Sequence, residues 1–182
     1  MLMRLIAIIA FLALLTVPCI AIPDSVMTGP YKISFDLGIP KEAYYVTVLD
    51  PKEKESLGGD KSIDYVVNIK NVTGIPRLAR ITLSKQEIER FLTPEEMKMS
   101  MGSYLPEIGL TDIETSVREI DGEQGAIGAG DIDISGLEVK VYQASYYPFK
   151  DTLVFITSSY PWDEGTLQLL KTIHIEKITA AA

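Results

Sequence analysis

Leu153-Val154-Phe155-Ile156 is a run of four apolar residues that does not alternate with polar ones. A strand with one solvent-exposed face alternates between apolar and polar residues. A run without alternation is therefore typical of a central strand covered on both faces. Helical signals lie on either side of this run in the sequence. We therefore predict an α+β fold, in which helices pack on both faces of a largely antiparallel sheet to give a three-layer α/β/α sandwich.

The remaining strands of this sheet are indicated by other β-rich runs. Tyr31-Lys-Ile-Ser-Phe-Asp-Leu37 alternates cleanly and predicts a strand with one buried face. Asp121-Gly122 and Ser135-Gly136 are turn signals between neighbouring runs. Residues 51–60, polar and glycine-bearing, predict a long exposed loop. The other expected strands are 44–49, 65–69, 78–83, 111–120, 123–134, 137–147 and a short final one within 172–178.

Two helices are expected. Thr93-Pro94-Glu95-Glu96 has the form of a capping box, with proline at the first helical position. In the helix that follows, Met97 and Met101 fall on one face with Tyr104 or Leu105. A methionine stripe can line an adaptable groove, but at this spacing we interpret it as ordinary core. The last helix follows residue 163 and turns Leu167 and Leu170 inward.

The N-terminal segment resembles a secretory leader. The apolar stretch 5–17 follows Arg4, is shorter than a membrane-spanning helix, and is followed by Pro18-Cys19-Ile20-Ala21. This predicts a signal peptide over 1–21 and a single exported domain over 22–182, secreted or at the extracytoplasmic cell surface. Two alternatives stay open, a lipid anchor on Cys19 and an uncleaved leader that tethers the domain.

Composition narrows the possible partners. The chain carries a net charge of −8, and loss of the leader's one arginine leaves 16 basic against 25 acidic residues, a net of about −9. Such a domain is unsuited to nucleic acid, and a membrane partner is expected only if the leader is uncleaved. Cys19 is the only cysteine, so the exported part has no disulfide and no thiolate metal site.

Several phrases are similar to the PsbP-like superfamily, which includes the extrinsic PsbP subunit of photosystem II and Ran-binding Mog proteins. They are Tyr31–Leu37, Ile120-Asp-Gly122, and Phe155–Trp162 leading to Leu169–Ile175. The resemblance covers nearly all of residues 30–178 and is one of fold and turns. It implies a non-catalytic binding or assembly role and assigns no ligand residue to this chain.

Candidate catalytic and metal residues are few. His174 is the only histidine, and alternation with Ile173 and Ile175 predicts that it faces solvent. A calcium site is one interpretation of four carboxylates near the predicted hairpins, Asp121, Glu123, Asp131 and Asp133. Solvent-exposed acids that bind no metal are the better interpretation. The glycines of 125–130 lack the Lys-Ser/Thr of a phosphate loop, so we expect them to let another backbone approach closely.

The clearest binding signal is aromatic. The candidate surface comprises Tyr142, Tyr146, Tyr147, Tyr160 and Trp162. Tyrosine and tryptophan each offer a large, rigid contact surface and one polar group, which favours binding to a partner. The same residues also commonly pack between a sheet and the helices that cover it. Separately, Asn71-Val-Thr73 is a possible N-glycosylation site.

The sequence contains no recognisable catalytic constellation, cofactor motif or metal-ligand set. The leading hypothesis is an exported non-catalytic binding or accessory domain for a protein or cell-surface partner. The alternative is an exported hydrolase that uses carboxylate acid/base chemistry, for which no pair of acids stands out. A surface structural protein is disfavoured because the chain has no internal repeat.

Overall fold

The computed structural model describes residues 24–55, 60–72, 77–87, 90–159 and 163–178. The strands there are β1 (Asp24–Thr28), β2 (Tyr31–Phe35), β3 (Tyr44–Val48), β4 (Lys52–Glu55), β5 (Lys61–Asn71), β6 (Arg77–Gln86), β7 (Thr111–Ile120), β8 (Glu123–Ile134), β9 (Leu137–Phe149), β10 (Thr152–Ser159) and β11 (His174–Lys177). The helices are the short 3-10 helix η1 (Lys41–Ala43), α2 (Pro94–Glu107) and α3 (Asp163–Thr172).

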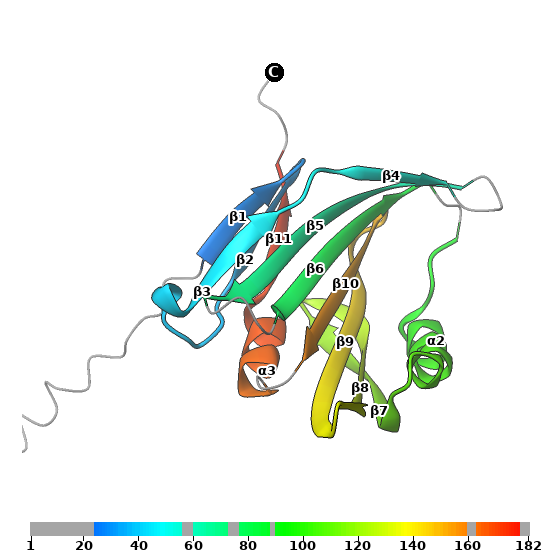
Figure 1. The fold of residues 1–182 in the computed structure, drawn as a ribbon. Helices are drawn as coiled ribbons and strands as arrows, with labels where there is room; N and C mark the ends of the chain where they lie inside the picture. The colour runs from blue at the N-terminus through cyan, green and yellow to red at the C-terminus, as the bar shows by residue number, and fades with distance from the viewer. Residues whose placement is uncertain (1–23, 56–59, 73–76, 88–89, 160–162, 179–182) are drawn as a thin grey trace, which may run out of the picture.

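Most strands form one large antiparallel sheet. Its order is β3-β5-β6-β10-β9-β8-β7, with β4 also paired to β5 (Figure 1). The hairpins β5–β6, β7–β8 and β8–β9 join strands that are neighbours in the sequence. β10 lies between β6 and β9, so both of its edges are hydrogen-bonded.

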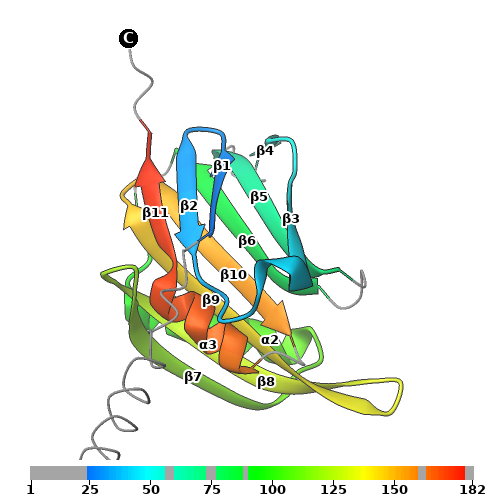
Figure 2. The ribbon, with the colours of Figure 1, turned by 90° about the vertical axis from the view of Figure 1, so that its left-hand side faces the viewer.

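A small sheet and one helix cover one face of the large sheet. The small sheet has the order β1-β2-β11, and Figure 2 shows α3 at the end of β11, beside the large sheet. Tyr31, Ile33 and Phe35 of β2 are fully buried against the large sheet, and Leu169 of α3 joins them. These residues, with the apolar side chains of β5, β6 and β10 that face them, form the main core.

The opposite face of the large sheet carries α2. Met97, Met101 and Leu105 of this helix are buried with Leu110 and with Ala126 and Leu153 of the sheet. We call this cluster the α2 core. The two cores lie on opposite faces of one sheet, and β10 contributes to both.

The expectation of an α+β fold with an α/β/α sandwich is wrong. The described residues are mostly β-sheet, with only two α-helices, and a sheet rather than a helix covers much of one face. The reason is that Tyr31–Phe35 pairs with β1 on one edge and with the C-terminal strand β11 on the other, so these strands form a separate small sheet instead of entering the central one.

The central position predicted for 153–156 is confirmed. Leu153 and Val154, adjacent in β10, are buried on opposite faces, in the α2 core and the main core respectively. Ile156 is also buried, on the same face as Val154. Phe155 packs on the α2 core but is only partly buried.

Both predicted hairpin turns are present. Asp121 and Gly122 have φ of 55° and 77°, and Ser135 and Gly136 have φ of 59° and 84°. Positive φ at both central residues of a two-residue turn matches the right-handed twist of the flanking strands. These turns fix the registers of β7–β8 and β8–β9.

The glycines of β8 allow the close backbone approach that the sequence predicts. A Cβ at Gly125 would lie 2.5 Å from the Ser145 carbonyl oxygen, and one at Gly130 would lie 2.9 Å from the Thr111 carbonyl oxygen.

Two predicted boundaries differ from the structure. Part of the expected loop 51–60 pairs with β5 as β4, because its alternating lysines and glutamates suit an exposed edge. The final strand begins at His174, after α3.

The predicted signal peptide, 1–21, lies outside the described residues. Within those residues, no helix combines the length and apolarity that crossing a bilayer requires.

Candidate functional site: the groove beneath α2

The start of α2 is fixed by the capping box that its sequence predicts. The Thr93 side chain accepts a hydrogen bond from the Glu96 backbone N–H, and the Glu96 carboxylate accepts one from the Thr93 N–H. Arg90 forms an ion pair with the same carboxylate. These bonds hold the pKa of Glu96 below its usual range, the backbone hydrogen bond from Thr93 contributing most. The helix is therefore anchored at its N-terminal end.

The methionine face of α2 points at the large sheet, as predicted. It does not pack against the sheet along its whole length, and a groove of about 350 Å³ remains between helix and strands. We call it the α2 groove. Its lining comes from α2 and the segment before it, and from β9 and β10: Leu92, Met97, Ser100, Met101, Tyr104, Gln143, Ser145, Leu153 and Phe155.

One buried hydroxyl points into this site. Ser145 is almost fully buried, and its Oγ lies 3.4 Å from the Met97 sulfur. A thioether is a weak acceptor, so this hydroxyl has spare capacity for a stronger partner. Gln143, half-buried two residues earlier on β9, adds an amide to the same wall. An apolar groove with a few polar groups is the usual form of a small-ligand site.

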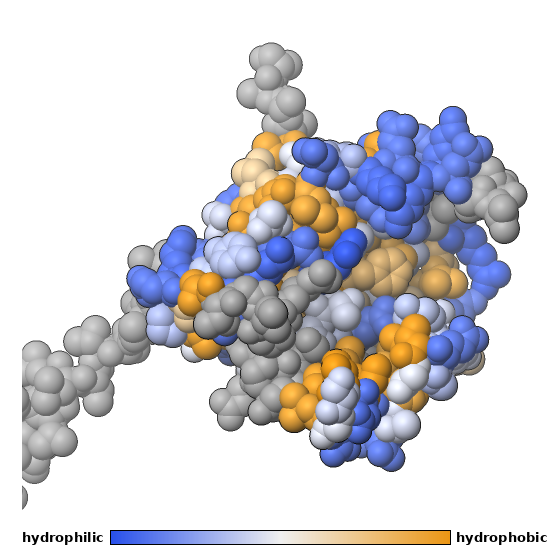
Figure 3. Space-filling view, in the orientation of Figure 1, coloured by the Kyte–Doolittle hydropathy of each residue, from blue (hydrophilic) through white to orange (hydrophobic). Residues whose placement is uncertain are grey.

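Exposed apolar side chains lie along α2 and the segments that flank it, and two of them, Leu92 and Tyr104, line the α2 groove. Figure 3 shows hydrophobic surface gathered over the lower right of the molecule, where α2 and the β7–β9 strands lie. The exposed large residues of this region include Phe91, Leu92, Met99, Tyr104 and Ile108. Scattered single apolar residues are normal on a surface, but a group beside an apolar groove is characteristic of a binding site.

Tyr147 packs against the α2 core and contacts the segment before α2. Its ring meets Phe91 edge-to-face, with centroids 5.4 Å apart and planes at 81°. Burial raises the pKa of Tyr147, and a hydrogen bond with the backbone of Leu92 partly offsets this. The residue thus holds the segment before α2 against the sheet and stays uncharged at neutral pH.

The predicted aromatic surface is not assembled as one patch. Tyr146 and Tyr147 are adjacent in β9, so they point to opposite faces of the sheet. Tyr146 lies in the main core with no exposed surface, Tyr147 packs against the α2 core on the other face, and Tyr142 is half-buried. Tyr160 and Trp162 lie outside the described residues.

The other candidate residues are separated in space. Asn71 ends β5, and Thr73 of its glycosylation sequon lies outside the described residues. The Asp133 carboxylate accepts a hydrogen bond from the Gly136 backbone N–H, 2.7 Å away, and so belongs to a turn. In the part of the chain that the structure describes, no three acidic, histidine or cysteine side chains group as metal ligands do.

His174 has a partner that the sequence analysis did not identify. Its Nδ1 lies 2.6 Å from Oδ1 of Asp121, and Oδ2 of Asp121 accepts a 2.9 Å hydrogen bond from the Ile175 backbone N–H. The histidine side chain is 58% exposed, as expected, but the Asp121 side chain is only 7% exposed. Asp121 therefore connects the β7–β8 turn to β11 and links the two sheets.

Tyr146 lies on the buried side of the same carboxylate. Its hydroxyl is buried close to Asp121. Burial, and then the nearby negative charge of Asp121, raise the pKa of Tyr146 well above its ordinary value. Tyr146 therefore remains protonated, and with Asp121 it forms a structural contact beneath the exposed histidine.

We expect Asp121→Ala to lower the free energy of unfolding by about 2–3 kcal/mol, because it leaves the Ile175 N–H without its acceptor and removes a charge-assisted bond. His174→Gln should cost less than about 1 kcal/mol, since the imidazole is exposed. Urea unfolding followed by circular dichroism measures both changes. A larger loss for the histidine variant would mean that His174, not Asp121, holds the two sheets together.

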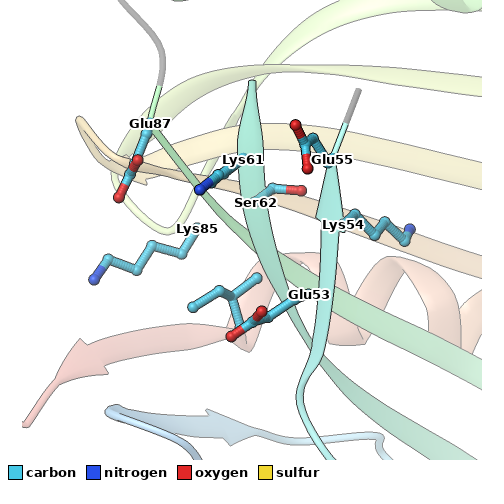
Figure 4. A pocket seen from close by; sticks show the side chains of 8 residues that line it. Glu53, Lys54, Glu55, Lys61, Ser62, Lys85 and Glu87 are labelled. Carbon is cyan, nitrogen blue, oxygen red and sulfur yellow. The ribbon is translucent and has the colours of Figure 1, made fainter. Parts of the chain in front are cut away.

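A second hollow, of about 500 Å³, lies at the far end of the large sheet and is lined mainly by charged residues of β4, β5 and β6. Figure 4 shows Glu53 and Glu55 on one side of β4 and Lys54 on the other. Glu53, Glu55 and Glu87 are all exposed. The acid of a glycosidase lies in a desolvated cleft, whereas these three carboxylates are exposed to solvent. The hollow has the form of a solvated mixed-charge surface.

Comparison with known proteins adds no family to these observations: a scan against family models and a search of curated proteins both return no match. The interpretation of the α2 groove therefore rests on its geometry alone.

Proposed function

We propose that this chain is an exported binding domain, and that the α2 groove is its recognition site for an aliphatic group. The observation that carries the proposal is the combination of an apolar groove with a buried hydroxyl, Ser145, whose present acceptor is a thioether. Methionine side chains at Met97 and Met101 suit such a site because they adapt to differently shaped apolar groups.

The chemistry of the lining defines the ligand class. Among the residues that line the groove, none is charged, and the polar groups are hydroxyls and one amide. A charged ligand would lose its hydration without a compensating partner. A neutral aliphatic group with one hydrogen-bonding function would fill the apolar volume and engage Ser145 or Gln143.

The proposal of export rests on the leader over 1–21, and the resemblance to the PsbP-like superfamily supports a non-catalytic role. An accessory domain of this kind acts by holding a group that a partner or a free molecule presents. The alternative of a carboxylate hydrolase has less support, because the acids of the charged hollow are exposed, Asp133 belongs to a turn and Asp121 to a contact between the sheets.

The first test uses 1-octanol, which has an aliphatic chain and one hydroxyl. With methyl-labelled methionine, titration should shift the NMR signals of Met97 and Met101, which line the groove, in a saturable manner. Met99, exposed on the same helix outside the lining, should shift little. Equal, non-saturating shifts at all three methionines would contradict the proposal.

A matched pair of variants tests whether octanol binds in the α2 groove. Ser100 lines the groove and is exposed, so Ser100→Trp should fill its mouth and weaken octanol binding at least about 10-fold, a loss of about 1.4 kcal/mol. Ser103→Trp puts the same side chain on an exposed position of the same helix that does not line the groove, and should leave binding unchanged. Equal weakening by both variants would place the site elsewhere.

A further inference from the structure

The β8–β9 hairpin extends beyond the strands on either side of it. Toward its turn, the pairing of β8 with β7 ends at Asp131. The pairing of β9 with the described part of β10 ends at Val141. Among the residues that the structure describes, 132–134 and 137–139 pair only with each other, up to Ile134 opposite Leu137. Figure 2 shows this hairpin projecting from the lower edge of the large sheet. We call Ile132–Val139 the hairpin tip.

The hairpin tip ends in two apolar side chains that have little cover. Ile134 is 55% exposed and Leu137 is 57% exposed. By alternation they share a face with Ile132 and Val139, of which Ile132 packs on the α2 core. The apolar face of the sheet therefore continues outward from the α2 core and ends on this exposed pair.

The hairpin tip is held in one conformation. Ser135 and Gly136 form a turn with positive φ at both residues, and the Asp133 carboxylate accepts a hydrogen bond from the Gly136 N–H. On the face opposite the apolar pair, Asp133 and Glu138 stand directly across from each other. A rigid projection that presents two aliphatic side chains loses little conformational freedom on binding.

We propose that the hairpin tip inserts Ile134 and Leu137 into the α2 groove of a second copy of this chain. The inference rests on the proposed function, because it names what supplies the aliphatic group. The two surfaces are complementary: a pair of branched aliphatic side chains on a projection, and an uncharged groove of about 350 Å³ lined by methionine, leucine and phenylalanine.

The contact joins different surfaces of the two molecules, so it is heterologous. Each copy keeps one free tip and one free groove, and association of this type continues into open chains unless a rotation closes it. Two side chains and the rim of a groove bury much less than the roughly 1,600 Å² of a standard interface. We therefore expect binding weaker than about micromolar.

Charge adds a second expectation. The chain has a net charge of −8, so two copies repel each other at low ionic strength. Salt screens that repulsion, with a Debye length of about 8 Å at 0.15 M, and leaves an apolar contact intact. Self-association should therefore strengthen from about 0.01 M to 0.15 M salt, whereas a contact made by opposite charges would weaken.

Sedimentation equilibrium over a concentration series up to about 1 mM tests the contact. The weight-average mass of the full chain should rise with concentration. The tip variant Ile134→Thr/Leu137→Thr and the groove variant Ser100→Trp should each stay monomeric. Both change exposed positions, and thermal melting checks that each variant is folded.

Mixing the two variants gives the decisive result. The tip variant keeps a working groove and the groove variant keeps a working tip, so together they should form a complex of one copy each and nothing larger. Ser103→Trp, the control on the same helix, should self-associate like the original chain. No complex in the mixture, or self-association of either variant alone, would overturn the inference.

The same samples separate this inference from the proposed function. If the chain stays monomeric but octanol still binds beside Met97 and Met101, the groove takes a free aliphatic ligand and the second-copy contact is wrong. If octanol does not bind and the mixture forms no complex, the proposed function is wrong as well.

Discussion

Val154→Asp should abolish the folded state. Val154 is fully buried in the main core, and β10 carries it between two hydrogen-bonded neighbours, so the strand has no edge through which the carboxylate can reach water. An unpaired buried charge costs several kcal/mol, and the loss of valine packing adds to this. Domains of this size are stable by only about 5–15 kcal/mol. Circular dichroism should show no cooperative melting transition, or one lowered by tens of degrees.

Phe155→Ala at the next residue is the control. Phe155 points to the opposite face and is only partly buried, so truncation should cost about 2–3 kcal/mol, below the 3–5 kcal/mol of a fully buried phenylalanine. The melting transition should remain cooperative. If Val154→Asp melts like the original chain while Phe155→Ala does not, the assignment of the two faces of β10 is wrong.

Gly125→Ala is expected to have the second largest effect. The added Cβ would lie 2.5 Å from the Ser145 carbonyl oxygen and 2.7 Å from the Tyr146 Cβ. Both atoms belong to β9, which pairs with β8 at this point, so relief requires the two strands to separate. We expect a loss of about 3 kcal/mol or more in the free energy of unfolding, measured by urea denaturation.

Gly128→Ala, three residues along the same strand, provides a matched comparison. Its Cβ would lie 2.6 Å from Leu105 Cδ1, the far end of a flexible side chain on α2. Leu105 can rotate away, so the cost should stay below about 1.5 kcal/mol. Equal losses for the two variants would show that the backbone of β9 yields as easily as a leucine side chain.

Local patterns in the sequence predicted most individual elements. Alternation identified Tyr31–Phe35 as a strand, the capping box located the start of α2, and Asp121-Gly122 and Ser135-Gly136 marked their turns. These signals depend on neighbouring residues only. They do not show which strands pair across the chain, so the small sheet of β1, β2 and β11 was not foreseen and the layer arrangement was wrong.

The α2 groove was not predicted, because the methionine stripe was interpreted as ordinary core. The spacing of Met97 and Met101 showed that they share a helix face, but not that Ser145 and Gln143 would stand opposite them and leave space. Alternation did contain one unused signal: Tyr146 and Tyr147, being adjacent, cannot lie on one surface of a strand. For His174, the unused signal was Asp121, an acidic residue at a turn position that commonly turns its side chain back to backbone N–H groups.

The pairing of β2 with β11 has a consequence for the order of folding. It joins Tyr31–Phe35 to His174–Lys177, two segments at opposite ends of the described chain. Forming it closes a loop of more than 130 residues, with a large entropic cost, so it should come late and refolding should be slow. Until residue 177 is available, one edge of β2 lacks the strand with which it pairs. A chain arrested before that point would leave this backbone edge of β2 open to pairing with strands of other unfinished copies.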